Sequence, residues 1–378
     1  MKVIELFSGA GGLSIGLINA GFEIVVANEI VSDFATTFSI NHPETLVVNK
    51  DIHFVDFCDV ISSLGVDKRN ISLVSGGPPC QGFSTVGSKN KKDPRNSLFY
   101  EYLRVVAEIS PNYILFENVS GFKSMYSGDA YHALINELGE IGYNLTGMVL
   151  DASDFGLPQI RHRTIIVGWK AGLPPVAMPT PTHCERENLF KYPLKLTIMD
   201  GISDLPPIGV RGSSEEYLTP PRNDYQKKMR SGCFGLSEHN ASNYGEKMQE
   251  ILRLIPEGGT VNDLPLHLRP KSYFGNTYAR LFPDRPAPTI TRNFGTPSSS
   301  RCIHPFQDRA LSTREGARLQ GFPDFYKFYG SKISKNLQIG NAVPPIFGEI
   351  VANEIKKNIM AQQGASADTP LAALGVPS

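Results

Sequence analysis

One of the five cysteines, Cys80, lies in the stretch Gly76-Gly77-Pro78-Pro79-Cys80-Gln81, directly after a short apolar run typical of a buried strand. The prolines stiffen this stretch and the glycines let it bend, so it can hold one side chain at the end of a strand. A cysteine is by default a small buried hydrophobic residue. A polar, glycine-rich loop is a poor place to bury an inert thiol, and a nucleophilic thiol needs partial exposure. The pattern therefore predicts Cys80 as a catalytic nucleophile.

Three further side chains are candidates to assist a thiolate. Glu117 ends another strand pattern, so in a parallel sheet it shares an edge with Cys80, where burial could raise its pKa into the range of a general acid. Arg161 and Arg163 stand at alternate positions before the last strand candidate and are expected to point the same way. Together they could hold a carbonyl oxygen or a phosphate. Each arginine alone could equally form a surface salt bridge, so the combination carries the prediction.

A glycine-rich segment, LFSGAGGL at residues 6–13, follows the first strand candidate and opens a helical pattern. Its backbone could approach a ligand closely. Ser14 occupies the third glycine position of G-x-G-x-x-G, which disfavours a pyrophosphate site. Glu29 and Asp51 follow the second and third strands, at the edge where such sheets bind ligands. These carboxylates and the aromatic Phe7 suit S-adenosylmethionine, although the loop alone could be a plain turn and Asp51 a helix cap.

Strand and helix patterns alternate along the first half of the chain, which is typical of a doubly wound α/β sheet with helices on both faces. Strands are expected at residues 2–7, 23–27, 71–75, 113–117, 143–150 and 164–169. After Trp169, closely spaced prolines interrupt every candidate helix and indicate a second, irregular domain. Regular patterns return near Leu311, and the segment from Pro345 to Lys357 predicts an amphipathic helix that returns to the first domain.

These patterns predict a catalytic and cofactor-binding domain at residues 1–175 and a small target-recognition domain at 176–310. Residues 311–357 are expected to return to the catalytic domain, and residues 358–378 to form a disordered tail.

The composition is that of an ordinary globular protein, with 378 residues of which 41% are hydrophobic and 20% charged. No run approaches the ~18 apolar residues of a membrane span, so we expect a soluble, cytoplasmic protein. The cysteines are odd in number and widely spaced, which predicts free thiols and no metal site.

A net charge of zero is unusual for a nucleic-acid enzyme, yet basic residues outnumber acidic ones in residues 85–104 and 211–301. Either cluster could also be an ordinary solvated face.

Taken in order, the motifs resemble those of the bacterial cytosine-5 DNA methyltransferases of restriction-modification systems. The matching blocks are LFSGAGGL, Asn28-Glu29, Asp51-Ile52, GGPPCQGFS, ENV, QIRHR, RPAPTITRN and QIGNAVPP. The resemblance implies an S-adenosylmethionine-dependent methyltransferase sheet of Rossmann-like type with a target-recognition domain. It also implies cofactor contacts from Phe7, Gly9, Gly11, Gly12, Glu29, Asp51, Ile52, Pro79, Asn341 and Val343.

The family mechanism that this resemblance implies is covalent. Cys80 adds to carbon 6 of a cytosine flipped out of duplex DNA, Glu117 hydrogen-bonds or protonates N3, and carbon 5 takes the methyl group. Arg161 and Arg163 would hold the base carbonyl and the thiolate region. Residues 84–96 are similar to the loop that closes over DNA in this family. DNA contacts are expected from Gln81, Ser84, Lys89, Lys91, Arg95, Arg269, Lys271, Tyr273 and Arg280.

Three other functions compete with this interpretation. A tRNA cytosine-5 methyltransferase shares most blocks, but Gly82-Phe83-Ser84 and the long recognition region favour DNA. An inactive DNA-binding relative is disfavoured because the catalytic residues are intact, and a nicotinamide-dependent dehydrogenase is disfavoured by Ser14. We expect a monomer acting on double-stranded DNA. The sequence does not reveal the target site or whether a cognate restriction endonuclease exists.

Overall fold

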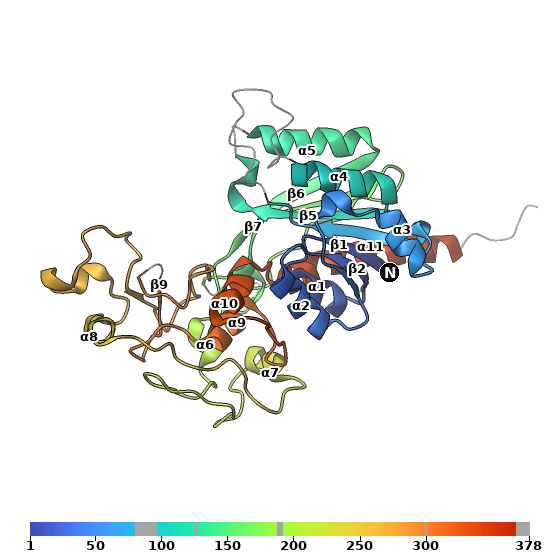
Figure 1. Ribbon diagram of the computed structural model, residues 1–378. Helices are drawn as coiled ribbons and strands as arrows, with labels where there is room; N and C mark the ends of the chain where they lie inside the picture. Colours follow the sequence, from blue (N-terminus) through green and yellow to red (C-terminus); the bar gives the residue numbers. More distant parts are fainter. Residues whose placement is uncertain (80–96, 125–127, 187–191, 299–300, 368–378) are drawn as a thin grey trace, which may run out of the picture.

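The computed structural model describes residues 1–79, 97–124, 128–186, 192–298 and 301–367. Within them, a large α/β part and a smaller part with little regular structure lie side by side (Figure 1). Six predicted site residues lie outside the described residues: Cys80, Gln81, Ser84, Lys89, Lys91 and Arg95.

Seven strands form one sheet in the order β3-β2-β1-β4-β5-β7-β6. They are β1 (Lys2–Leu6), β2 (Glu23–Asn28), β3 (Leu46–Val48), β4 (Ile71–Gly76), β5 (Tyr113–Val119), β6 (Tyr143–Asp151) and β7 (His162–Lys170). The first five are parallel, so their carboxyl ends meet at one edge, whereas β7 runs antiparallel to β5 and β6. The beginning of β7, rather than its end, therefore reaches this edge. The predicted fold class is confirmed.

Helices cover both faces of the sheet (Figure 1). One face packs on α3 (Phe57–Ser63), α4 (Ser97–Ile109) and α5 (Asp129–Glu140), and the other on α1 (Gly12–Asn19), α2 (Ser32–Asn41) and α11 (Pro345–Ala367). The side chains of β1 alternate between these two cores: Ile4 and Leu6 lie in one, and Val3 lies in the other. Each strand thus contributes to both apolar layers.

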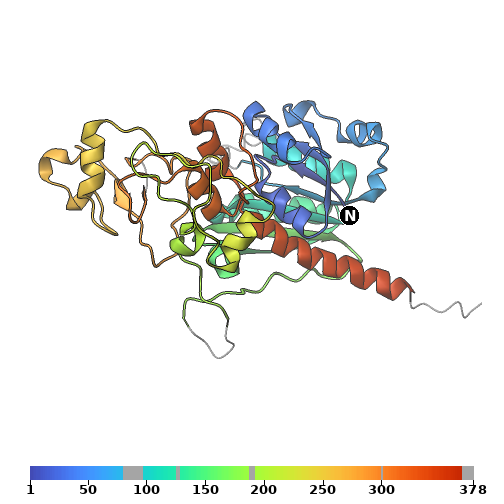
Figure 2. The same cartoon turned by 90° about the horizontal axis from the view of Figure 1, so that it is seen from below.

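The predicted return of the chain to the first domain is made by α11, the long red helix that runs alongside the sheet in Figure 2. Its backbone touches that of α1, since an added Cβ at Gly16 would lie 2.0 Å from the carbonyl oxygen of Pro345. The helix continues to Ala367, past the predicted end at residue 357. Gln362 anchors this extension by donating a 2.7 Å hydrogen bond to the hydroxyl of Tyr113 on β5.

The small part contains short elements joined by long loops. They are α6 (Ile198–Ile202), α7 (Asp224–Arg230), α8 (Glu246–Leu254), β8 (Ala279–Arg280), β9 (Arg301–Ile303), α9 (Thr313–Gln320) and α10 (Lys332–Asn341). One apolar cluster joins Ile198 and Leu281 to Leu311 and Leu319, so the core crosses the predicted boundary at residue 311. None of the helices described here is long and apolar enough to cross a membrane.

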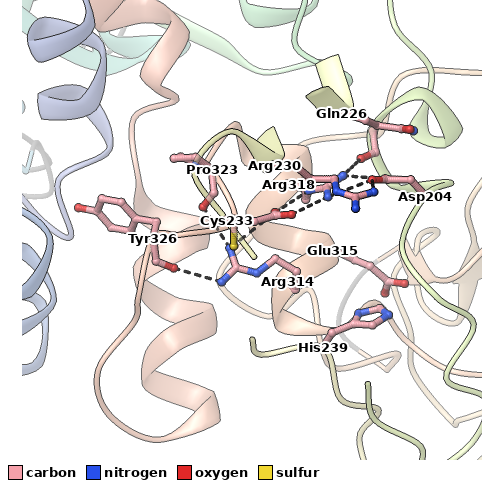
Figure 3. A network of polar contacts seen from close by, with 12 residues as sticks. Asp204, Gln226, Arg230, Cys233, His239, Arg314, Glu315, Arg318, Pro323 and Tyr326 are labelled. Carbon is pink, nitrogen blue, oxygen red and sulfur yellow. Dashed lines mark hydrogen bonds and ion pairs between the residues drawn. The ribbon is translucent and has the colours of Figure 1, made fainter. Parts of the chain in front are cut away.

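Buried ion pairs stabilise the small part where regular backbone structure is sparse (Figure 3). The guanidinium of Arg318 on α9 bonds the carboxylates of Asp204, at 2.8 Å, and Asp324, at 2.6 Å, and all three side chains are fully buried. Arg314, one turn earlier, donates to the main-chain oxygens of Ser237 and Tyr326. Helix α9 therefore holds several distant loop segments in place through its arginines.

Candidate active site

A cavity of about 1190 Å³ opens at the carboxyl edge of the sheet. Ligand pockets commonly enclose roughly 300–1,000 Å³, so this one has room for a cofactor and part of a second ligand. It is lined by the loops after β1, β2, β3, β4 and β5, the start of β7 and the end of α10. Eight of the ten predicted cofactor residues line it: Phe7, Gly9, Glu29, Asp51, Ile52, Pro79, Asn341 and Val343.

The loop after β1 is bound to the carboxylate of Glu29, which directly follows β2. Oε2 of Glu29 accepts a 2.9 Å hydrogen bond from the amide of Gly9, and Oε1 accepts a 2.8 Å bond from the amide of Val31. Burial raises the pKa of Glu29, and these amides oppose that shift. Phe7 has a φ of 55°, a left-handed conformation that bulky residues rarely adopt outside functional sites. The loop is thus held in an unusual conformation at the cavity wall. The carboxylate of Glu29 can still accept further hydrogen bonds from a ligand.

Asp51 both caps a short helical turn and lines the cavity. Its carboxylate accepts from the amide of His53, at 3.1 Å, and lies 2.7 Å from His53 Nδ1, so it caps the short helical turn Ile52–Phe54. Hydrogen bonds from His53 lower the pKa of Asp51. Both residues also line the cavity. The helix-cap interpretation is confirmed and is compatible with a cofactor contact.

The remaining two predicted cofactor residues, Gly11 and Gly12, do not line the cavity. A Cβ at Gly11 would lie 2.5 Å from the hydroxyl of Tyr326, and one at Gly12 would lie 2.3 Å from the carbonyl oxygen of Val343. These glycines therefore allow the C-terminal segment to pack under the loop, and their placement supports a packing role rather than the predicted ligand contact.

At the other end of the cavity, Glu117 lies under the residues that lead into Cys80. A Cβ at Gly77 would come within 2.7 Å of Glu117 Oε2, so any larger residue there would displace the carboxyl group. Nδ2 of Asn118 donates to the carbonyl oxygen of Pro78 at 3.0 Å and fixes the same stretch. Burial raises the pKa of Glu117, while the charges of Arg163 and Arg161 oppose that shift. The pKa of Glu117 therefore lies above its ordinary value, because burial outweighs the opposing arginine charges.

The two arginines of QIRHR occupy different places. Arg163 lines the cavity, and its Nε lies 2.8 Å from Oε1 of Glu117. Arg161 is buried and donates to the main-chain oxygens of Ile290, Gly340 and Ala342 at 2.8–2.9 Å. The expectation that both guanidinium groups point the same way does not match this geometry, because β7 begins at His162 and strand alternation does not extend to Arg161.

Comparison with known proteins agrees with this geometry. The family model for C-5 cytosine-specific DNA methylase matches residues 1–357. The chain belongs to this family. The resemblance seen in the sequence is confirmed, and the enzyme class is DNA (cytosine-5-)-methyltransferase, EC 2.1.1.37.

Relatives of this methylase include two curated bacterial enzymes. Type II methyltransferase M.DdeI of Desulfomicrobium norvegicum is 34% identical over 94% of this chain and 88% of its own length. Type II methyltransferase M1.HphI of Haemophilus parahaemolyticus is 33% identical over 94% of this chain and 87% of its own length.

Two solved structures share the fold. A prophage-encoded E. coli protein, described as a DNA modification methyltransferase, superposes with a TM-score of 0.76 at 28% identity and covers 95% of this chain and 99% of its own. DNMT2 of Spodoptera frugiperda, at 18% identity over 95% of this chain and 99% of its own, has a TM-score of 0.56, which shows the fold alone.

The four predicted DNA contacts in the small part of the methylase differ in accessibility. Lys271 and Tyr273 are exposed, and Arg269 is partly buried and donates to the main-chain oxygens of Leu264 and Asn262. Arg280 is 5% exposed, and its guanidinium bonds four main-chain oxygens and Asp308. Its placement does not support the predicted DNA contact, because its donors already bind protein.

Glu5 and Gln338 are among the cavity residues of the methylase that were not predicted as site residues. Glu5, in the middle of β1, is 1% exposed and lines the cavity, as does Gln338 of α10. A carboxylate inside an otherwise apolar strand was a usable signal for Glu5, since unpaired charges are rarely buried. Gln338 carried no such signal, because its position depends on the return of α10 to the sheet.

Proposed function

We propose that this chain methylates carbon 5 of cytosine at a specific sequence in duplex DNA, as the modification enzyme of a restriction-modification system. One observation carries the proposal. A single cavity joins the loop bound to Glu29 with the Glu117–Arg163 pair, beside the residues that lead into Cys80. The Type II names of the curated relatives support a DNA substrate over tRNA.

The cavity residues fit S-adenosylmethionine. The oriented carboxylate of Glu29 suits ribose hydroxyls, and Phe7 and Ile52 offer apolar surface to the adenine. Asn341, at the end of α10, would meet the methionine portion. When bound, the cofactor supplies an electrophilic methyl group. The absence of a phosphate-binding glycine fingerprint is consistent with a cofactor that has no phosphates.

The chain's own residues would prepare the base. Cys80 thiolate forms a bond to carbon 6, and Glu117 donates a proton or hydrogen bond at N3, which places electron density on carbon 5. Arg163 would hold the base carbonyl and fix the orientation of Glu117. After methylation, water or another base takes the carbon 5 proton, and expulsion of the thiolate restores the aromatic ring. The cytosine must leave the helix for this chemistry, because its carbon 6 is inaccessible in a stacked duplex.

Transfer of labelled methyl groups tests the substrate. Purified protein with S-[methyl-³H]adenosylmethionine is expected to label duplex DNA and to leave tRNA unlabelled. Bisulfite sequencing of DNA from a host that expresses the chain is expected to show protected cytosines in one sequence context. Label in tRNA, or protected cytosines without a common context, would contradict a sequence-specific DNA enzyme.

The nucleophile has its own test. Cys80→Ser is expected to abolish turnover and covalent trapping by DNA containing 5-fluorocytosine, because trapping requires the sulfur–carbon 6 bond. Binding of S-adenosylhomocysteine should persist in this variant. Cys58→Ser is a matched control, since Cys58 is a partly buried free thiol of α3 away from the cavity lining. Trapping by Cys80→Ser would exclude Cys80 as the nucleophile.

A further inference from the structure

Tyr326 connects the small part of the protein to the loop after β1. Its main-chain oxygen accepts a 3.1 Å hydrogen bond from Arg314, as Figure 3 shows. Its hydroxyl donates a 2.6 Å hydrogen bond to the carbonyl oxygen of Ala10. Tyr326 is 1% exposed and packs against Phe322 and Phe328. A rigidly held side chain from one end of the sequence therefore supports a loop at the other end.

The supported loop depends on bonds from outside itself. Phe7 has a left-handed backbone, with a φ of 55°. Such a conformation is strained for a bulky residue and persists only where the surroundings fix it. Gly11 is also left-handed, with a φ of 84°, which glycine adopts without strain. The amide of Gly9 is bound by Glu29, and the carbonyl oxygen of Ala10 is bound by Tyr326. These two bonds hold consecutive residues of the loop from opposite ends of the chain.

His42 completes the support beneath the loop. Its Nε2 lies 3.1 Å from the Tyr326 hydroxyl, and its ring packs at a tilt against Phe38 with centroids 4.7 Å apart. Burial lowers the pKa of His42 to about 4, so the ring is neutral near pH 7. Because the hydroxyl proton is donated to Ala10, the neutral ring must donate from Nε2. The hydroxyl is thus fixed by one donor and one acceptor, and a Cβ at Gly11 would displace it.

We propose that Tyr326 is a positioning residue for the methyl-donor site, whose hydroxyl holds the loop so that Phe7 and Gly9 face the ligand. The inference rests on the proposed use of S-adenosylmethionine. It assigns to the segment after α9 a role in cofactor binding, although Tyr326 itself does not line the cavity.

Tyr326→Phe tests this role by removal of one hydroxyl group. Binding of S-adenosylhomocysteine, measured by isothermal titration calorimetry well below the melting temperature, is expected to weaken by roughly 2–10-fold, which is the value of one hydrogen bond. Tyr225→Phe is the matched control, because the Tyr225 hydroxyl donates to the main-chain oxygen of Arg318, remote from the cavity. Both variants should lose thermal stability, but only Tyr326→Phe should lose affinity.

The outcomes separate the possible explanations. Unchanged affinity in Tyr326→Phe, or an equal loss in Tyr225→Phe, would overturn the positioning role. If Tyr326→Phe does not fold, His42→Leu replaces it, since this change removes the donor to the hydroxyl and leaves the bond to Ala10 intact. Here a smaller loss of affinity is expected, and none would overturn the role. Failure of the wild-type protein to bind S-adenosylhomocysteine would instead refute the proposed cofactor.

Discussion

Nε of Arg163 lies 2.8 Å from Oε1 of Glu117, and the pair spans the step from β7 to β5 at the carboxyl edge of the sheet. Both side chains are largely buried at the cavity wall. Burial raises the pKa of Glu117, and the charges of Arg163 and Arg161 oppose that shift. The proposed proton donation to a base would use this raised pKa.

Substitutions of the two arginines of QIRHR should differ in effect, one acting on catalysis and the other on stability. Arg163→Met is expected to lower kcat strongly while the protein stays folded, since Arg163 faces the cavity. Arg161→Met should instead reduce the free energy of unfolding by about 3–5 kcal/mol, because three buried carbonyl oxygens lose their donor. Urea unfolding and steady-state kinetics of both variants check this pair. Equal stability losses would contradict the distinction.

Glu5 should make stability depend on pH. Burial raises its pKa from 4.5 to about 8, and a 2.6 Å hydrogen bond from Ser14 offsets this shift only in part. Above pH 4.5 the folded state therefore holds a proton on Glu5 that the unfolded state releases. The contribution of this group to folding stability is complete below pH 4.5 and is lost as the pH rises through about 8. Glu5→Gln should match the wild type near pH 4.5 and exceed its stability by a few kcal/mol near pH 8.

Thermal unfolding of both proteins between pH 5 and 8.5 measures this difference. Glu23→Gln is a suitable control, because Glu23 is exposed at the start of β2 and forms a surface ion pair with Lys2. A stability difference between Glu5→Gln and the wild type that does not grow with pH would refute the assignment.

Much of the fold follows from local sequence patterns. The alternating strand and helix signals place Glu29, Asp51 and Glu117 at strand ends, and the parallel order of the first five strands then brings them to one cavity. Helix α11 was also predictable, because its apolar spacing required a partner.

The unpredicted features depend on contacts between distant segments. Arg161 faces carbonyl oxygens from residues 290, 340 and 342, and Arg280 bonds residues between 252 and 308. A single sequence gives no sign of such partners. In the sequence alone, an arginine that binds main-chain oxygens therefore looks the same as one that binds phosphate. Likewise, Gln362 extends α11 through its bond to Tyr113, which no helical propensity encodes.

The small part should depend on its buried ion pairs. Arg318→Met leaves the carboxylates of Asp204 and Asp324 without their main partner and is expected to cost about 3–5 kcal/mol. Chemical denaturation measures this cost. Lys227→Ala serves as the control, since its ion pair with Asp224 is exposed and such pairs contribute about 0–1 kcal/mol. A loss in Arg318→Met as small as in Lys227→Ala would show that the network is not required.

Lys271 should contribute to DNA binding through phosphate rather than through bases. It is exposed, near the exposed Tyr273 and Phe274, whereas the nearby Arg280 is committed to the protein interior. A lysine that neutralises one phosphate releases about 0.9 counterion, so Lys271→Ala should lower the slope of log Kd against log salt by about 0.9. The melting temperature should not change. Fluorescence anisotropy with duplex DNA from 50 to 300 mM salt, roughly the range over which such slopes are measured, gives both values. Lys227→Ala should leave the slope unchanged, and an unchanged slope in Lys271→Ala would place the DNA elsewhere on the small part.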